Sequence, residues 1–547
     1  MLNKTKLLSA LLCAALLLNL CAGCSRKVPD EELFTLRACV CGPIASLDPS
    51  QNTDSAANTV FAALFENLLR LETGEDGAQT LALGLAHEYE AHENYDGTTT
   101  YTFTLRSAAR WSSGARVKAE DFVFAWRRLI DPARENPNSD LLHMICGYDE
   151  ARESGDTSKL AVSAESGTVL SVTVDSECVH FLQSVCTSPV TAPMQRKAVQ
   201  SDDWTDAAAV LCCGPYRVES WDTADTLVLV KNEEYYGAQT LTPDRLVFTL
   251  SDDEAAAYAL YCDGGLDVTA FSGALTLREE DAAFRRPTAR TVCLLFNQLS
   301  DWLSDETLRA ALFDAVDRSE LAAALGAQAN VPATGLVPDG IAGGAEGVSF
   351  RETSGELLSA DGAERETRMA MARSRLEDLR QSGTALRLIC TQGDGNERLA
   401  ELLCAHWLLR LDISVTPEAL TPEEYDARLA AGEYDLALGT LSAVRDDAWE
   451  FLDCWRSGHE GNVAGSANTS YDLLLGAAEN SSDPAARMAF LCDAEALLLE
   501  DCAVLPLCFT GRAFLVREGL QGADYASTRD ALDLSRITEA RASAQNG

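Results

Sequence analysis

The sequence predicts a mixed α/β protein built from more than one lobe. Its 547 residues would fill roughly two to four units of ordinary size, and 47% hydrophobic residues suffice for real cores. The first half is rich in short alternating segments, whereas the second half alternates strand and helix patterns. We therefore expect a strand-rich first part, followed by parallel strands joined through right-handed crossovers.

The first half contains several half-buried strands. Residues 98–106 alternate apolar and polar side chains directly after the Asp96-Gly97 turn, which is typical of a strand with one buried face. A helix is expected from about Ala119, and Asp131-Pro132 stops it. Further strands are indicated around residues 170–174, 227–229 and 246–250.

The second half alternates strands and helices. The expected elements are, in order, helix 365–381, strand 386–390, a helix capped by Asn396, strand 413–420, a helix opened by Thr421, strand 434–441, a helix opened by Asp483-Pro484 and strand 504–509. The strongest local signal is Thr421-Pro422-Glu423-Glu424, a capping box with proline at the first helical position. Ligands of such sheets bind beyond the carboxyl ends of strands, so the segment after Leu441 is the expected ligand region.

The first 24 residues are typical of an exported lipoprotein. Lys4 and Lys6 precede an apolar run over residues 7–18, which is too short to cross a hydrocarbon core of about 30 Å. Residues 20–24 read Leu-Cys-Ala-Gly-Cys and resemble the bacterial lipobox, in which a peptidase cuts before a lipid-bearing cysteine. We expect residues 1–23 to be a signal peptide and Cys24 to be the lipidated first residue. The alternative is an ordinary signal peptide cut nearby.

The charge balance argues against nucleic acid as a partner. The chain has 84 acidic and 44 basic residues and a formal net charge of -40, without any basic patch for a phosphate backbone. No later stretch reaches 18 apolar residues, so the lipid is the expected membrane link. A surface this acidic would mildly favour cationic or neutral solutes.

The 18 cysteines are expected to be mostly free thiols, apart from those in the leader. Most of the others lie in apolar strand or helix patterns, where cysteine acts as a small hydrophobic residue. Metal binding is not expected. Neither the alternating Cys39 and Cys41 nor the vicinal pair Cys212-Cys213 has Cys-x-x-Cys spacing, and His87 and His92 would face opposite sides of a strand.

A series of short motifs runs through most of the chain. They include Ser46-Leu47-Asp48-Pro49, Leu64-Phe65-Glu66-Asn67-Leu68-Leu69, Trp111-Ser112-Ser113-Gly114, Gly214-Pro215-Tyr216, Phe296-Asn297, Pro332-Ala333-Thr334-Gly335, Gly432-Glu433-Tyr434-Asp435 and Leu505-Pro506-Leu507. In this order they resemble the family 5 extracellular solute-binding proteins, whose best-known members are the oligopeptide-binding proteins of ABC importers. The resemblance covers roughly residues 33–510.

This resemblance implies a two-lobed fold of the periplasmic-binding-protein type II-like kind, with an inserted small α+β domain and a ligand cleft between the lobes. The implied segments are 24–52, 187–285 and 505–547 for the first lobe, 53–186 for the insert and 286–504 for the second lobe. The two crossings between the lobes, near residues 285 and 505, would act as the hinge.

The resemblance also implies a function. The protein would capture short peptides outside the cytoplasmic membrane and deliver them to the permease and ATPase subunits of an ABC importer. It would act as a monomer, lipid-anchored and extracytoplasmic, with no cofactor. Two alternatives stay open: a receptor for a non-peptide solute or signal peptide on the same fold, and a surface hydrolase or adhesin.

The segment after strand 434–441 departs from the family pattern. In oligopeptide-binding relatives it resembles Gly-Trp-x-Ala-Asp-Tyr, whose Asp pairs with the ammonium group of the bound peptide. Here Thr440 stands in the Trp position and Ala443 in the Asp position. Asp446 or Asp447 would substitute if the loop shifts; otherwise both are solvated loop acids. The expected ligand-binding residues are Asn297, Thr440, Ser442, Asp446, Asp447 and Trp449, with backbone capping as the alternative role for Asn297.

An enzyme is not expected. The sequence contains no Gly-x-Ser-x-Gly elbow, no P-loop and no Gly-x-Gly-x-x-Gly fingerprint. We therefore assign no catalytic residue.

Overall fold

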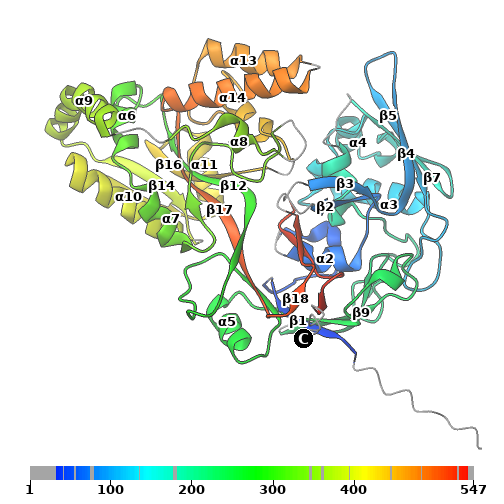
Figure 1. The fold of residues 1–547 in the computed structure, drawn as a ribbon. Helices are drawn as coiled ribbons and strands as arrows, with labels where there is room; N and C mark the ends of the chain where they lie inside the picture. Colours follow the sequence, from blue (N-terminus) through cyan, green and yellow to red (C-terminus); the bar gives the residue numbers. More distant parts are fainter. Residues whose placement is uncertain are drawn as a thin grey trace, which may run out of the picture.

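The computed structural model describes residues 33–40, 42–53, 57–73, 79–134, 136–175, 181–223, 225–343, 348–358, 362–393, 395–443, 446–481, 483–526 and 529–539. The predicted signal peptide and Cys24 lie outside these residues. The described chain forms two lobes that stand side by side and are joined by two long strands (Figure 1). We call the lobe that contains β1 the first lobe, and the lobe that contains β14 the second lobe.

One mixed sheet runs through both lobes. Its strand order is β15-β14-β16-β12-β17-β11-β1-β10-β9-β8, with β13 added to β17. The strands on the side of the first lobe are β1 (Thr35–Cys39), β8 (Tyr216–Asp222), β9 (Thr226–Lys231), β10 (Arg245–Thr249) and β11 (Val268–Phe271). Those on the side of the second lobe are β13 (Val331–Pro332), β14 (Leu386–Thr391), β15 (Val415–Leu420) and β16 (Leu436–Ser442).

Two 13-residue strands, β12 (Phe284–Phe296) and β17 (Val504–Val516), link the lobes. They pair antiparallel, and the register shifts between Pro287 and Thr291, where the strands pass from one lobe to the other. Such a shift bends a strand locally. β17 is longer than the strand predicted over 504–509, because its second half pairs with β11 of the first lobe.

The first lobe carries a smaller antiparallel sheet of order β4-β5-β7-β6 and a β2–β3 hairpin. The elements are α2 (Asn58–Leu64), β2 (Leu69–Thr73), β3 (Gln79–Leu83), β4 (Ala86–Glu93), β5 (Thr99–Leu105), α3 (Ala119–Leu129), α4 (Tyr148–Ser154), β6 (Val162–Ser166) and β7 (Val169–Val174). The alternation predicted for β5 is confirmed, since Tyr101, Phe103 and Leu105 are buried and the residues between them are not. The first lobe ends with α5 (Glu254–Cys262) and the C-terminal strands β18 (Leu520–Gln521), β19 (Asp524–Ala526), β20 (Ala531–Asp533) and β21 (Thr538–Glu539).

The second lobe has the predicted strand and helix order. Its helices are α6 (Glu306–Asp314), α7 (Arg318–Gly326), α8 (Phe350–Ser354), α9 (Gly362–Ser382), α10 (Asn396–Leu411), α11 (Pro422–Ala430), α12 (Trp449–Leu452), α13 (Thr469–Glu479) and α14 (Pro484–Glu500). The predicted parallel pairing is present, between β14 and β15 and between β14 and β16. The Thr421 capping box is confirmed. The Asn396 cap is wrong, because Gly395 at φ +78° is the N-cap and the Asn396 side chain donates to Thr391 Oγ1.

Each lobe has its own core. One apolar cluster unites the smaller sheet, α2, α3 and β8–β11, so the strand-rich region shares its core with the rest of the first lobe. In the second lobe, α6, α7, α9 and α10 cover one face of the sheet, and α8 and α11–α14 cover the other. The large sheet is therefore buried on both faces in the second lobe, as a parallel sheet requires.

The cysteines agree with the free-thiol prediction. Throughout the described residues all the cysteines are free thiols, and many are buried. Over the same ranges, no helix combines the length and the apolar character that crossing a bilayer demands.

Candidate functional site

The end of β16 presents two exposed hydroxyl groups. Thr440 and Ser442 alternate along the strand and are both exposed, whereas Leu436 and Leu438 further back are buried. In the ladder with β12, Thr440 lies opposite Val292 and Ser442 lies opposite Arg290. Because paired residues of a ladder project to the same face, the two hydroxyls and Arg290 share one face near the crossing between the lobes.

The next residue offers no polar group. Ala443 is 6% exposed, and its backbone N–H donates to Ala289 O at 2.9 Å. A side chain here is enclosed in the core of the second lobe. This position therefore cannot supply a carboxylate to a ligand.

Asp446 and Asp447 are engaged within the second lobe. Asp446 Oδ1 accepts from the Ala342 backbone N–H at 2.6 Å. Asp447 is 8% exposed, accepts from the Trp449 N–H at 2.8 Å and forms a 2.9 Å ion pair with Arg487. Asp447 is therefore a buried acid with a local role at the start of α12, whereas Asp446 is partly exposed and joins its loop to Ala342.

Two guanidinium groups lie near the ring of Trp449. The Arg456 guanidinium lies 4.8 Å from the centre of its ring, and that of Arg487 lies 5.9 Å away. Both distances are in the range of cation–π attraction. Trp449 therefore links α12 to α14 and to the segment after α12.

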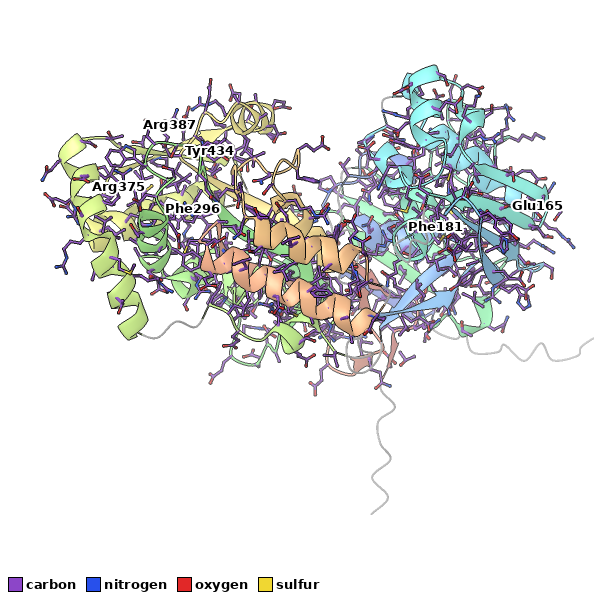
Figure 2. All side chains as sticks on the ribbon, turned by 90° about the horizontal axis from the view of Figure 1, so that it is seen from above. Glu165, Phe181, Phe296, Arg375, Arg387 and Tyr434 are labelled. Carbon is purple, nitrogen blue, oxygen red and sulfur yellow. The ribbon has the colours of Figure 1, made fainter. Side chains whose placement is uncertain are left out.

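Asn297 lies apart from the other predicted residues. Asn297 directly follows Phe296, the residue of β12 that pairs with Leu436. Ser442 pairs with Arg290, which lies six positions before Phe296 on the same strand. Figure 2 shows Phe296 and Tyr434 in the second lobe, away from the first lobe. The buried Asn297 side chain donates to Gly432 O at 3.2 Å and Tyr434 O at 2.8 Å, and accepts from the Leu299 N–H at 3.1 Å. These contacts match backbone capping, the alternative weighed from the sequence.

Three arginines at the crossing were not among the predicted site residues. Arg286 lies directly opposite Arg512 in the ladder between β12 and β17, and Arg290 follows on β12. Arg512 Nε donates to Asp530 Oδ1 at 2.6 Å, and the Tyr525 hydroxyl donates to the same oxygen at 2.8 Å. The sequence of the two strands could have indicated a basic site, since β12 and β17 contain arginines and no acidic residue.

Two of the three arginines act on one buried hydroxyl group, that of Tyr525. Burial raises the pKa of its hydroxyl well above the ordinary value, and Asp530 adds to this rise. The positive charges of Arg512 and Arg290 act on the same hydroxyl in the opposite direction. Both guanidinium groups are therefore within electrostatic reach of Tyr525, although they come from different strands.

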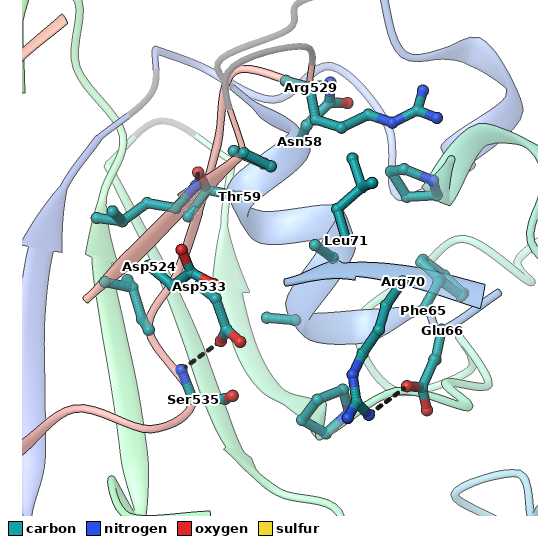
Figure 3. A pocket seen from close by; sticks show the side chains of 18 of the residues that line it. Asn58, Thr59, Phe65, Glu66, Arg70, Leu71, Asp524, Arg529, Asp533 and Ser535 are labelled. Atoms are coloured by element: carbon teal, nitrogen blue, oxygen red, sulfur yellow. Dashed lines mark hydrogen bonds and ion pairs between the residues drawn. The ribbon is translucent and has the colours of Figure 1, made fainter. Parts of the chain in front are cut away.

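The first lobe contains a separate cavity of about 340 Å³ (Figure 3). It lies between α2, β2, residues 235–241 and the C-terminal segment 524–536. None of the six predicted ligand-binding residues is among the residues described as lining it. The cavity and the predicted site are thus different places.

A buried carboxyl group lines this cavity. Glu66 is 7% exposed, and burial raises the pKa of its side chain to about 7. The Tyr236 hydroxyl donates to Oε1 at 2.9 Å, and Arg70 Nη1 lies 3.6 Å from the same oxygen (Figure 3). Oε2 is buried and has no hydrogen-bond partner among the described residues. An ionised carboxylate is costly in such a place, which accounts for the raised pKa.

Arg529 joins the C-terminal segment to residues 183–187 beside the cavity. Its Nη2 donates to Ser184 O at 2.6 Å, Thr187 Oγ1 at 2.5 Å and also Gln183 O. Burial lowers the pKa of its guanidinium to about 10. These bonds tie residues 183–187 to the chain end, so we read Arg529 as a structural anchor.

The described residues contain no group of three or more His, Cys, Asp or Glu side chains that could hold a metal ion. His87 and His92 lie on β4, as predicted, where nearly all side chains are exposed.

Comparisons with known proteins agree with this architecture. The dipeptide-binding protein DppE of Bacillus subtilis is 25% identical over 483 residues, which cover 87% of each chain. The probable deoxycholate-binding periplasmic protein YgiS of Escherichia coli is 26% identical over 476 residues, which cover 84% of this chain and 85% of YgiS. Among solved structures, the unliganded open form of the periplasmic murein tripeptide binding protein MppA matches 93% of this chain and 98% of its own, with a TM-score of 0.73 and 22% identity.

The match to a family model decides the assignment. The model described as "Bacterial extracellular solute-binding proteins, family 5 Middle" matches residues 80–462, which is most of the chain. Proteins of this family bind solutes and are not enzymes. The chain belongs to family 5 of the bacterial extracellular solute-binding proteins.

Proposed function

We propose that this protein is the substrate-binding lipoprotein of an ABC importer, which captures short peptides outside the cytoplasmic membrane and delivers them to the permease. The observation that carries the proposal is similarity over most of the chain to proteins named for binding dipeptides, oligopeptides and murein peptides. Among the described residues two long strands join the lobes, which suits such a role, because lobes of this kind can close on a ligand by bending at the crossing.

The proposed ligand position is the face between the lobes at the end of β16. Thr440 and Ser442 are exposed there and can donate or accept hydrogen bonds. Asp446, Asp447, Trp449 and Asn297 already make contacts within their own lobe, so Thr440 and Ser442 are the leading ligand contacts among the six residues.

The lobe boundaries belong to the same proposal. The first lobe would comprise residues 24–52, 187–285 and 505–547, the insert 53–186 and the second lobe 286–504. The supporting observation is that β12 and β17 change their pairing partners near residues 285–290 and 509–513. We further propose that the protein is a monomer, anchored through a lipid on Cys24 and partnered by permease and ATPase subunits.

A non-peptide solute is the second candidate. One relative of similar sequence identity is named as a probable deoxycholate-binding protein, so similar proteins are named for different kinds of ligand. A receptor that reports a signal peptide would use the same lobes.

The test is to identify the ligand directly. The chain from residue 25 onward is purified without denaturant, then denatured, and the released small molecules are analysed by mass spectrometry. Release of peptides a few residues long would support the proposal. Release of a bile-acid-like compound, or of no organic molecule after incubation with a peptide mixture, would contradict it.

Lipidation has its own test. Labelling with a radioactive fatty acid should mark the wild-type chain and not the Cys24→Ala variant. Equal labelling of both chains would refute the assignment of Cys24.

A further inference from the structure

We infer that the ligand carries a carboxylate, and that Arg286, Arg290 and Arg512 form the place where it binds. This inference rests on the proposed function, since it takes the solute to be held between the lobes. It adds the charge of the ligand and the residues that recognise this charge.

The first observation is the composition of the two linking strands. The whole chain has 84 acidic residues against 44 basic ones. The 26 residues of β12 and β17 nevertheless contain four arginines, Arg285, Arg286, Arg290 and Arg512, and no acid. The strands that join the lobes therefore reverse the charge of the rest of the molecule.

The second observation is an unfavourable pair. Arg286 and Arg512 lie directly opposite each other in an antiparallel ladder, where like charges destabilise a sheet. Arg512 is compensated by Asp530. Arg286 is exposed and has no carboxylate contact among the described residues; its guanidinium lies 4.9 Å from the Phe284 ring. An anion between the two arginines would remove the repulsion.

The face of the strands is the third observation. Arg285 projects to the other side, where it pairs with Asp339 and donates to Ala329 O beside the apolar cluster of Phe271 and Leu515. Arg286 and Arg512 project toward Asp530 and Tyr525 of the C-terminal segment. In Figure 1 this segment lies on the side of β17 that faces α2, opposite the side of α5.

Arg290 and Ser442 add donors on the same pair of linking strands and on β16. Arg290 lies beside the exposed Ser442 and, like Arg512, within electrostatic reach of Tyr525. Guanidinium groups form paired hydrogen bonds with carboxylates, and the hydroxyl of Ser442 can add a further donor. Ala443 leaves the neighbouring position without a competing carboxylate.

Local charge outweighs the net charge at such a place. Fixed charges are screened over about 8 Å at physiological salt, so acids elsewhere on the surface contribute little to the potential at the crossing. The sequence-based expectation of cationic or neutral solutes therefore does not extend to the crossing between the lobes.

The experiment uses two matched tripeptide libraries, one with free carboxyl termini and one amidated, both without acidic side chains. A third, amidated library carries one Glu in every member. Each is incubated with the purified chain, unbound peptide is removed by gel filtration, and retained peptide is quantified by mass spectrometry. We expect at least tenfold more retention of free-acid than of amidated neutral peptides. Rescue by the Glu library would identify a side-chain carboxylate as the group bound, and retention of the free-acid library alone would identify the carboxyl terminus.

The variants are Arg286→Gln, Arg290→Gln and the control Arg285→Gln, which removes the same charge one residue away on the opposite face. Arg286→Gln should lose the preference for carboxylates without lowering Tm, because it also removes the repulsion with Arg512. Arg285→Gln should keep the preference. Equal retention of free and amidated peptides by the wild type, or an unchanged preference in both Arg286→Gln and Arg290→Gln, would overturn the inference and leave the proposed function standing. Retention of no library would overturn both.

Discussion

Replacing Glu66 by Gln should remove part of the pH dependence of stability. The pKa of this carboxyl group rises to about 7 in the folded protein, from an ordinary value near 4.5, because the group is buried. The folded state therefore holds a proton that the unfolded chain releases. Below pH 4.5 both states are protonated and the group costs nothing. As pH rises toward 7 the unfolded chain ionises first, so stability falls.

The size of this effect follows from the pKa difference. Each pKa unit corresponds to about 1.4 kcal/mol, so a shift of roughly two and a half units costs the wild type about 3 kcal/mol above pH 7.5. Gln does not titrate, and its amide oxygen can still accept from the Tyr236 hydroxyl. The free energy of unfolding of Glu66→Gln, minus that of the wild type, should therefore increase by about 3 kcal/mol between pH 4.5 and pH 7.5.

Urea unfolding followed by circular dichroism at several pH values measures this difference, and subtracting the two curves cancels the other titrating groups. Glu72→Gln is the matched control on the neighbouring strand. Although burial acts to raise it, the hydrogen bond and charge of Arg70 lower the pKa of Glu72. Its difference curve should therefore run in the opposite direction. A flat curve for Glu66→Gln, or the same sign for both variants, would refute the reasoning.

Three further outcomes follow from buried contacts. Glu495 is fully buried, accepts from the Leu336 and Val337 N–H groups at 2.7 and 2.8 Å, and pairs with Arg351. Glu495→Ala should therefore lower the free energy of unfolding, measured in urea, by about 3 to 5 kcal/mol. A loss below about 1 kcal/mol would contradict this prediction. Asp447→Ala should lower Tm, because the ion pair with Arg487 is lost. The amounts of free-amino and of N-acetylated peptide that the protein retains should change equally. A selective loss of free-amino peptides would instead show that Asp447 contacts the ligand. Burial raises the pKa of five buried thiols to about 11 or 12, so a thiol reagent at pH 8 should modify them slowly until denaturant is added. Rapid modification at these positions in the native protein, located by mass spectrometry of its peptides, would refute their burial. These thiols are Cys39, Cys212, Cys390, Cys502 and Cys508.

Local signals predicted the elements well where a few adjacent residues decide the conformation. The Thr421 box opens α11 because its partners lie three residues apart, and the buried face of β5 follows from simple alternation. Asn396 failed as a cap because Gly395 adopts the left-handed conformation, which costs a glycine little. The length of β17 also failed, since its second half is a strand only through its partners β11 and β12.

The candidate site was predictable as a region and not as a set of contacts. The strand order pointed to the end of β16, and Thr440 and Ser442 are indeed exposed there. The contacts of Asp447 with Arg487 and of Asn297 with Tyr434 O join residues 40 and 137 positions apart, so spacing in the sequence could not reveal them.

The sequence by itself determined the family, the two-lobed α/β fold and the order of its elements, because these depend on apolar periodicity and on motifs of adjacent residues. Only the tertiary structure decided which polar groups already have partners and which remain available. It brought β12 beside β17, set Arg286 opposite Arg512, and enclosed Glu66 behind the C-terminal segment. The physical reason is that strand register and burial are set by residues distant in the chain, and these determine the charge and pKa of each group.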